Sequence, residues 1–209
     1  KAINFAILLC ILFFVSSCKK EVETDEPINE KVYIAGWTNS FSSPYFGTYW
    51  VNGVAVNFPT GSKLSEANAI FVSGADMYVA GREFLAGKYI GKVLKNGITI
   101  HTLDNPHDLY ITSMYISGTD VYVCGYGVSN ALGRPIAKYW KNGTVFNLGD
   151  GTSDTRANAI VVSGNDVYVA GSSSNAPVCL GRYWKNGNPV DLTSPPGDAG
   201  LHTIAINGN

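Results

Sequence analysis

The sequence predicts an all-β fold, a β-propeller of four-stranded antiparallel blades that follows an N-terminal signal segment. Three observations lead to this prediction. Short sequence markers recur with a period of about 45 residues, and each repeat reads as four short strands separated by turn residues. The composition also suits strands, because 23 of the 209 residues are glycine, 12 are tyrosine and only 15% are charged. Glycine permits tight turns, and tyrosine suits a half-buried pleated surface.

The first residues differ from the rest of the chain. An almost wholly apolar stretch, Ala2 to Val15, follows Lys1, and two serines then precede Cys18. A charged start, an apolar stretch and small residues form the pattern of an export signal. The stretch is also shorter than the about 20 apolar residues that span a membrane as a helix. We therefore predict a signal peptide over residues 1–17.

The segment V-S-S-C, which ends at Cys18, resembles the lipobox of bacterial lipoproteins. The resemblance implies that the Cys18 sulfur is lipidated, that Cys18 becomes the first residue of the mature protein, and that this lipid contacts a membrane. The charged run after Cys18 buries too little apolar surface to fold, so we predict a flexible tether over residues 18–31. Its lysines and acids also resemble the surface-export signal of some Gram-negative lipoproteins, which implies the bacterial outer membrane or cell surface as the location.

Three markers repeat in step from residue 32 onward. Copies of the first, such as V-Y-V-A-G, begin at Val32, Met77, Val121 and Val167, which are 45, 44 and 46 residues apart. Copies of the second, such as Y-W-K-N-G, begin at Tyr49, Val93, Tyr139 and Tyr183. Copies of the third, such as V-S-G-N-D, begin at Val72, Ile116 and Val162. Three independent markers with one period indicate a repeat architecture.

The second unit shows the four predicted strands most clearly. β-branched and aromatic residues separated by turn signals predict strands over residues 68–73, 76–80, 89–95 and 98–103. Asn96-Gly97 lies between the last two strands and is typical of a two-residue type I′ hairpin. The same pair recurs in the other units, at Asn52-Gly53, Asn142-Gly143 and Asn186-Gly187.

The two ends of the repeat region leave two arrangements open. The predicted blade units cover residues 32–58, 67–103, 110–148 and 157–192, with a final strand over 201–206 in the region 32–209. The first unit begins at its second strand, so the final strand either completes it and closes a ring of four blades, or starts a further blade. Closure removes exposed sheet edges. We expect the second arrangement, part of a larger propeller, because the sequence lacks an initiating methionine and stops inside a marker, and because four is the low end of blade numbers.

The repeat A-x-x-I-x-V-S-G-x-D-V-Y-V-A-G … Y-W-K-N-G resembles that of uncharacterised bacterial lipoproteins, and the resemblance covers residues 32 to 206. It implies a propeller fold and no particular activity. The second unit departs from the pattern, with Val93-Leu94 where the others have Tyr-Trp. Because a tryptophan returns at this one position in the other units, we predict that Trp50, Trp140 and Trp184 pack between blades.

Blade connectivity assigns the loops to two faces. The S-G-x-D and Asn-Gly turns share one end of the blades, which we call the uniform face. The turns between second and third strands and the crossovers between blades share the other end, the variable face, and variable loops on a rigid scaffold commonly bind ligands. Aromatic and arginine side chains favour recognition, and aromatic rings stack on sugars. The candidate ligand-binding residues on this face are Trp37, Tyr45, Phe46, Arg82, Glu83, Phe84, His107, Asp108, Tyr126, Arg134 and Arg156.

The leading hypothesis is a non-enzymatic binding module at the cell envelope, with a glycan or a protein as its ligand. The net charge of −1 gives no electrostatic case for nucleic acid. Catalytic and metal-ligand motifs are missing, so we predict no catalytic residues, no metal and no cofactor. Cys124 and Cys179 fall at different repeat positions, which favours two small buried thiols over a disulfide.

Two alternatives stay open. A carbohydrate-active enzyme, a hydrolase or lyase, needs two converging carboxylates, one with a raised pKa. Acidic residues in the crossovers of the variable face supply candidates, namely Glu66, Asp104, Asp108, Asp150, Asp154 and Asp198. The second alternative is a truncated fragment without an independent function.

Overall fold

The computed structural model describes residues 30–39, 44–59, 64–129, 133–175 and 177–207. The chain divides into two compact units, residues 1–30 and residues 31–209, and the fold below is that of the second unit. The predicted signal segment, Cys18 and all but the last two residues of the predicted tether lie outside the described residues.

Four antiparallel sheets make up the described part of the second unit, and we number them in chain order. Sheet 1 holds β1 (Tyr33–Thr38), β2 (Phe46–Val51) and β3 (Val54–Asn57). Sheet 2 holds β4 (Ser65–Ser73), β5 (Asp76–Leu85), β6 (Lys88–Lys95) and β7 (Ile98–Leu103). Sheet 3 holds β8 (Leu109–Ser117), β9 (Asp120–Ser129), β10 (Arg134–Lys141) and β11 (Thr144–Asn147). Sheet 4 holds β12 (Asp154–Ser163), β13 (Asp166–Asn175), β14 (Val178–Lys185) and β15 (Asn188–Asp191).

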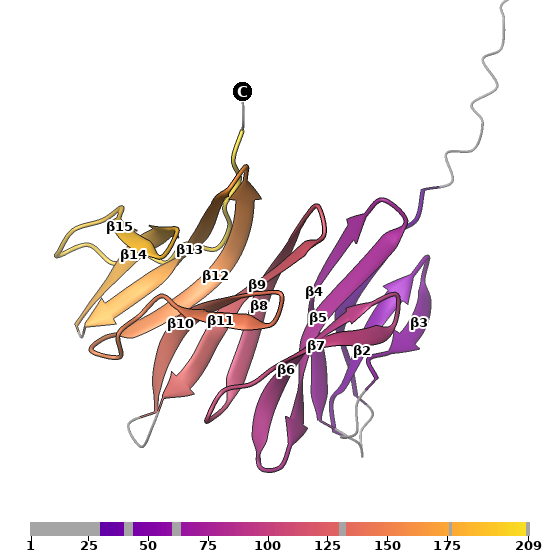
Figure 1. Cartoon of the computed structure of the whole chain (residues 1–209). Coiled ribbons are helices and arrows are strands. Elements are labelled where there is room, and N and C mark those ends of the chain that lie inside the picture. Colours follow the sequence, from indigo (N-terminus) through magenta and orange to yellow (C-terminus); the bar gives the residue numbers. More distant parts are fainter. Residues whose placement is uncertain (1–29, 40–43, 60–63, 130–132, 176, 208–209) are drawn as a thin grey trace, which may run out of the picture. The chain divides into compact units, whose positions relative to one another are not determined.

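Each sheet is a meander in which hydrogen-bonded neighbours are also neighbours in sequence. The sheets follow one another in chain order, from sheet 1 in purple to sheet 4 in gold (Figure 1). The first strands of sheets 2 to 4 are adjacent, because β4 contacts β8 and β8 contacts β12, and β1 of sheet 1 contacts β4. Repeated four-stranded meanders placed in this way are propeller blades, so the predicted fold class is confirmed. Sheet 1 has three strands, as expected for a unit that begins at its second strand.

The Asn-Gly turns have the backbone conformation that the sequence predicts. Each of the four asparagines has a positive φ, between 50° and 52°, and each following glycine has a φ between 79° and 85°. Two consecutive positive φ angles define the type I′ turn, whose twist matches that of the flanking strands. These turns therefore set the register of the third and fourth strands in all four sheets.

Side chains on the uniform face tie the two kinds of turn together. In sheet 2, the Asn96 carboxamide accepts a hydrogen bond from the Met77 N–H (2.9 Å) and donates one to Asp76 (2.8 Å). The Lys95 ammonium lies 2.8 Å from the same carboxylate. Hydrogen bonds from Lys95 and then from Asn96 hold the pKa of Asp76 below its usual value. Sheets 3 and 4 repeat this arrangement with Asp120, Lys141 and Asn142 and with Asp166, Lys185 and Asn186.

The hydrophobic core lies between the sheets. Trp140 of β10 is 1% exposed and belongs to a cluster shared by sheets 2 and 3, whereas Trp184 of β14 is fully buried in a cluster shared by sheets 3 and 4. Leu94 takes the equivalent place between sheets 1 and 2 and is also fully buried. The prediction that this repeated position packs between blades is confirmed for Trp140 and Trp184, and the departure at Leu94 keeps an apolar side chain there.

A β-bulge interrupts the first strand of sheets 2, 3 and 4, between Ala67 and Ala69 in the first of them. In sheet 3 the bulged residue is Thr112, and its hydroxyl donates a hydrogen bond to the Ala157 carbonyl of the next sheet (2.8 Å). In sheet 4 it is Asn158, and its side chain donates to the Leu201 carbonyl (2.6 Å). Leu201 therefore lies beside sheet 4 as Ala157 lies beside sheet 3.

The structure forms no strand over residues 201–206, where the sequence predicts a final one. In sheets 2 to 4, the first strand forms its ladder with the second strand of the same sheet. Within the described residues, no such strand follows Ile206. The segment therefore has the position of a first strand beside sheet 4 without the ladder that defines one.

The second strands are longer than predicted. The predicted strand over residues 76–80 ends before Gly81, but β5 continues to Leu85 and turns at Ala86-Gly87. Gly81 is thus an interior residue of the strand, opposite the bulge of β4, and not its end. The third strands β2 and β10 and the first strand β12 also extend into segments that we expected to be variable loops. Seven candidate residues expected in those loops therefore lie on strands, namely Phe46, Arg82, Glu83, Phe84, Tyr126, Arg134 and Arg156, and the candidate Trp37 lies on β1.

Candidate functional site

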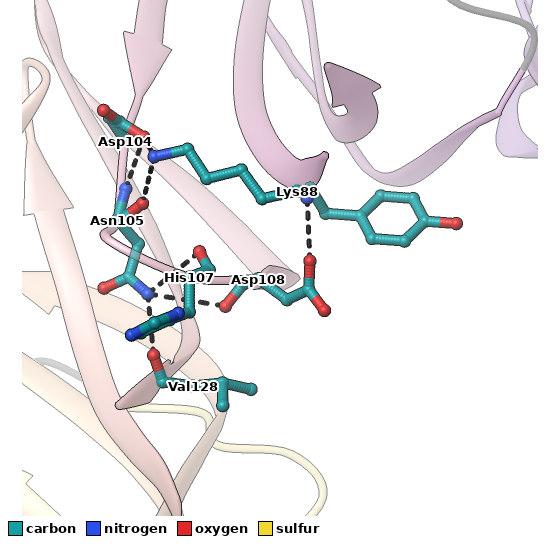
Figure 2. A network of polar contacts seen from close by, with 7 residues as sticks. Lys88, Asp104, Asn105, His107, Asp108 and Val128 are labelled. Atoms are coloured by element: carbon teal, nitrogen blue, oxygen red, sulfur yellow. Dashed lines mark hydrogen bonds and ion pairs between the residues drawn. The ribbon is translucent and has the colours of Figure 1, made fainter. Parts of the chain in front are cut away.

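The turns between second and third strands and the crossovers share one end of the sheets, as predicted for the variable face. The Lys88 ammonium, at the start of β6, donates hydrogen bonds to Asp104 (2.7 Å) and to the Asn105 carbonyl (2.5 Å) in the crossover (Figure 2). The Tyr89 N–H donates to the Asp108 carboxylate of the same crossover (2.9 Å). These bonds hold the crossover against the start of the third strand.

Five side chains from three sheets stack in a continuous row on this face, and we call them the aromatic–arginine column. The Arg82 guanidinium carbon lies 4.2 Å from the ring centroids of both Tyr89 and Tyr110, so it is held between two rings. Tyr110 stacks on Tyr126 with centroids 4.7 Å apart and ring planes 12° apart. Arg156 ends the row 5.5 Å from the Tyr126 ring. All of these separations are within the range of cation–π or aromatic attraction.

The repeat itself places these side chains in register. The second cross-strand pair before each bulge joins Glu66 to Arg82 in sheet 2, Tyr110 to Tyr126 in sheet 3, and Arg156 to Ser172 in sheet 4. Directly opposed residues project from the same face of a sheet. One ladder position, repeated three times beside adjacent first strands, therefore brings four of the five column residues together, and Tyr89 joins from β6.

Glu66 anchors the buried part of the column. Its two carboxylate oxygens accept hydrogen bonds from the Arg82 guanidinium, at 2.8 Å and 3.0 Å, in the bidentate geometry of a strong ion pair. Burial opposes the charge of Glu66, but the hydrogen bond and charge of Arg82 outweigh it and lower the pKa of Glu66. The third guanidinium nitrogen, Nη1 of Arg82, is buried without a hydrogen-bond partner. The rings on either side therefore provide most of its surroundings.

The other candidate residues are distributed around this column. Trp37 and Tyr45 form a separate edge-to-face pair in sheet 1, with centroids 4.6 Å apart and about half of each side chain exposed, and Phe46 beside them is half-buried. Phe84 packs edge-to-face on Tyr89, a column residue, with centroids 5.3 Å apart. The exposed aromatic surface of the variable face is therefore divided between sheet 1 and the column.

Glu83 does not contribute to the exposed surface that we expected. Its side chain is 1% exposed and pairs with the Lys92 ammonium at 2.5 Å, on the face of β5 that packs against sheet 1. His107 is exposed, and its carbonyl accepts a hydrogen bond from Asn105 (3.1 Å; Figure 2). Asp108 is half-buried in the crossover, where it accepts the hydrogen bond from the Tyr89 N–H, and Arg134 donates to the Thr152 carbonyl (2.9 Å). These residues hold crossovers and turns in place.

Sequence reasoning did not single out Tyr89 and Tyr110. Tyr110 ends a crossover predicted on the variable face, Tyr89 begins a predicted strand, and both lie near the start of a strand in the structure. A signal for Tyr110 was available: it aligns in the repeat with Glu66 and Arg156, 44 residues after the first and 46 before the second. The stacking itself could not be read from spacing, since it joins side chains of different sheets.

The six carboxylates of the enzyme alternative do not converge. A cavity of about 540 Å³ lies between sheets 3 and 4 on the variable face, and Asp150 is the one of the six that lines it. Hydrogen bonds from Thr152 lower the pKa of Asp150, opposite to the change that a general acid needs. Each of the six contacts a neighbouring group that fixes local structure; in sequence order these are Arg82, Lys88, the Tyr89 N–H, Thr152, Arg134 and the Cys179 N–H.

Other kinds of site receive no support within the described ranges. No group of three or more His, Cys, Asp or Glu side chains is placed to hold a metal ion among them. None of the described residues forms a helix that is long and apolar enough to cross a membrane. Cys124 and Cys179 are both free thiols, the first buried and the second half-buried, and burial raises the pKa of Cys124 to about 12. Cys124 is therefore a packing residue and not a nucleophile.

Comparisons with known proteins leave the chain without an assigned family. No protein-family model matches the sequence, and no curated protein matches it either.

Proposed function

We propose that the protein is a lipid-anchored binding module, without enzymatic activity, that recognises a glycan with its variable face at the bacterial envelope. The aromatic–arginine column carries this proposal. It brings three tyrosines and two arginines, residue types that favour recognition, to the variable end of three adjacent blades. Aromatic faces stack on the apolar face of sugar rings, and guanidinium groups donate hydrogen bonds to their hydroxyls.

The column is held in place by its own contacts, which supports a role in ligand recognition. Stacking between neighbours and the ion pair of Arg82 with Glu66 hold the rings in place before a ligand arrives. Binding to a preformed surface avoids the cost of ordering side chains, about 0.5–1.5 kcal/mol for each one. Arg156 at the end of the row is exposed, so its guanidinium can reach a ligand.

The proposed location at the membrane follows from the N-terminal segment. Its apolar stretch, the small residues before Cys18 and the charged run after it are those of an exported protein that is lipidated and then held on a tether. Two or more acyl chains give stable membrane attachment, because each buried CH₂ contributes about 0.8 kcal/mol. The tether would separate the blades from the membrane and leave the variable face accessible.

Replacing Cys18 with alanine is expected to release the protein from membranes, because the thiol that carries the lipid is lost. Detergent phase separation of cells that express the whole chain measures this: the parent chain should enter the detergent phase, and Cys18→Ala should leave it. Cys10→Ala, a second cysteine within the signal segment, is the matched control and should behave like the parent. Recovery of Cys18→Ala in the detergent phase would contradict the anchor.

Shortening the column is expected to weaken glycan binding at least about tenfold, a loss of about 1.4 kcal/mol. The variants are Arg156→Ala, which removes an exposed guanidinium, and Tyr126→Leu, which removes a stacked ring. Binding of the whole chain in detergent to a glycan array, followed by titration of the glycans it retains, measures the effect. Phe146→Ala is the control, because Phe146 is an exposed aromatic residue on the outer strand β11 and lies outside the column. Equal binding by all three variants, or an array without any bound glycan, would refute the proposal.

A further inference from the structure

The clefts between neighbouring sheets differ at one equivalent position on the variable face. On the second strand this position comes one residue after Arg82, Tyr126 and Ser172. It is Glu83 in sheet 2, Gly127 in sheet 3 and Ser173 in sheet 4. In each sheet it faces the preceding sheet. The side chain at this position and its neighbours determine whether the cleft toward the preceding sheet is filled or open.

Two of the three clefts are filled by polar side chains. Between sheets 1 and 2, Glu83 itself fills the space and is neutralised by Lys92. Between sheets 2 and 3, the Asn105 side chain lies against Gly127, so closely that a Cβ on this glycine would collide with its carboxamide. Asn105 is 6% exposed and donates hydrogen bonds to the carbonyls of His107 (3.1 Å) and Val128 (3.0 Å), as Figure 2 shows.

The third cleft, between sheets 3 and 4, is open and contains the cavity of about 540 Å³. Ser173 is too short to fill it, and the crossover of this cleft supplies Asp150, Thr152 and Ser153 instead of an inserted amide. The Ser153 and Ser173 hydroxyls lie 3.2 Å apart on one wall. A volume of this size is within the range of small-molecule sites in proteins, about 300–1,000 Å³.

The two walls of the cavity differ in chemistry. The crossover and the first two strands of sheet 4 supply the Asp150 carboxylate and four hydroxyl groups, together with Leu148. The third and fourth strands supply mainly apolar side chains, Val178, Leu180 and Pro189, together with Arg182. A pyranose ring has the same division, with hydroxyl groups around its edge and an apolar C–H face. We propose that this cavity binds a neutral hexopyranose unit of a glycan, with its hydroxyls toward Ser153 and Ser173 and its C–H face toward the aliphatic wall.

The charges of the cavity favour a neutral sugar over an acidic one. Arg182 at its edge is already engaged by both oxygens of Asp191, at 2.5 Å and 3.0 Å. This ion pair lowers the pKa of Asp191, so the carboxylate stays charged and continues to neutralise the guanidinium. Asp150 adds a negative charge that would repel an acidic ligand. No free cation among the described lining residues is therefore placed to receive a carboxylate or phosphate.

Thr155 lines the cavity, and Arg156, which ends the column, is the next residue near the start of β12, with its side chain on the opposite face of the strand. A glycan chain held by one residue in the cavity could thus continue toward Arg156. This inference rests on the proposed glycan-binding function, and it specifies the site and the sugar class.

The test places the residues that fill the cleft between sheets 1 and 2 at the equivalent positions of the open cleft between sheets 3 and 4. Ser173→Glu places an acid where Glu83 lies, and Ser173→Glu with Arg182→Lys reproduces the Glu83–Lys92 pair in full. The whole chain in detergent is titrated with maltotriose, cellotriose and mannotriose, and with trigalacturonic acid as the charged comparison. We expect at least one neutral trisaccharide to bind, and both filled variants to weaken its binding at least about tenfold while thermal unfolding remains cooperative. Thr38→Glu makes the same change at the equivalent position of sheet 1 and should leave binding unchanged.

Three outcomes would overturn the cavity assignment: binding of only the acidic sugar, no binding of any neutral trisaccharide, or unchanged binding in both filled variants. The last outcome is separable from failure of the proposed function. A glycan whose binding falls in Arg156→Ala but not in Ser173→Glu would show recognition at the column and not in the cavity.

Discussion

Replacing Gly125 with alanine is expected to lower the free energy of unfolding by at least about 3 kcal/mol, the upper range for inserting atoms into a packed interior. Gly125 is the glycine of the V-Y-V-C-G marker and lies within β9. A Cβ at this position would overlap the carbonyl oxygen of Tyr110 on the adjacent strand. Because that oxygen belongs to the backbone, a rotamer change cannot relieve the clash.

The bulge in the first strand explains the collision. It shifts the register between Ile111 and Ser113 and directs the carbonyl before it toward the glycine. Gly81 and Gly171 meet the carbonyls of Glu66 and Arg156 in the same way. The glycine is therefore required in every sheet whose first strand has the bulge.

Thermal unfolding of the whole chain measures the effect. A loss of 3 kcal/mol corresponds to a decrease in Tm of about 6–12 °C for a domain of this size. Gly200→Ala is the control, because a Cβ there meets no atom within 4 Å. A Gly125→Ala variant that melts together with the Gly200→Ala variant would show that the bulge tolerates a side chain.

Replacing Trp184 with alanine is expected to cost about 3–5 kcal/mol, the range for removing a fully buried large aromatic side chain. Trp184 has no exposed surface and packs between sheets 3 and 4, against residues that include Tyr122, Cys124 and Val169. Its removal leaves a cavity that the two sheets can close only by moving together. The loss should therefore appear as a lower midpoint of urea unfolding.

A leucine at the same position should recover part of this loss. Leu94 occupies the equivalent position of sheet 2 and is itself fully buried. The indole N–H of Trp184 is buried without a hydrogen-bond partner, so Trp184→Leu leaves no acceptor unpaired. Trp37→Ala provides the comparison, since Trp37 is 50% exposed and its loss should have a much smaller effect. Equal unfolding midpoints for Trp184→Ala and Trp37→Ala would refute the assigned role in packing.

Much of the fold could be predicted because its signals are local or periodic. The type I′ turns follow from the residue pair Asn-Gly, whose backbone preferences act within two residues. The packing of Trp140 and Trp184 follows from their return at one repeat position. The strand ends were predicted wrongly where a glycine was interpreted as a boundary, because Gly81 is required by a bulge on the neighbouring strand and not by a turn.

The candidate site was predicted less completely. Arg82, Tyr126 and Arg156 were expected on the variable face, and they do lie together there. Tyr89 and Tyr110 were missed, and Glu83 was expected at the surface although it is buried against Lys92. Burial at such a position depends on the neighbouring sheet, and sequence spacing contains no information about it.

The four-strand repeat, its turn types, the apolar position between blades and the uniform and variable faces follow from the amino-acid sequence alone. Each of these depends on residues within one repeat or on their recurrence. Which side chains of different blades meet, and hence the column, the bulge contacts and the open cleft, is seen only in the folded chain. These features depend on side-chain volume and on the register between neighbouring sheets. The space beside Gly127 is filled by Asn105, and the space beside Ser173 stays open, because of residues about 20 positions away in the chain or on separate blades.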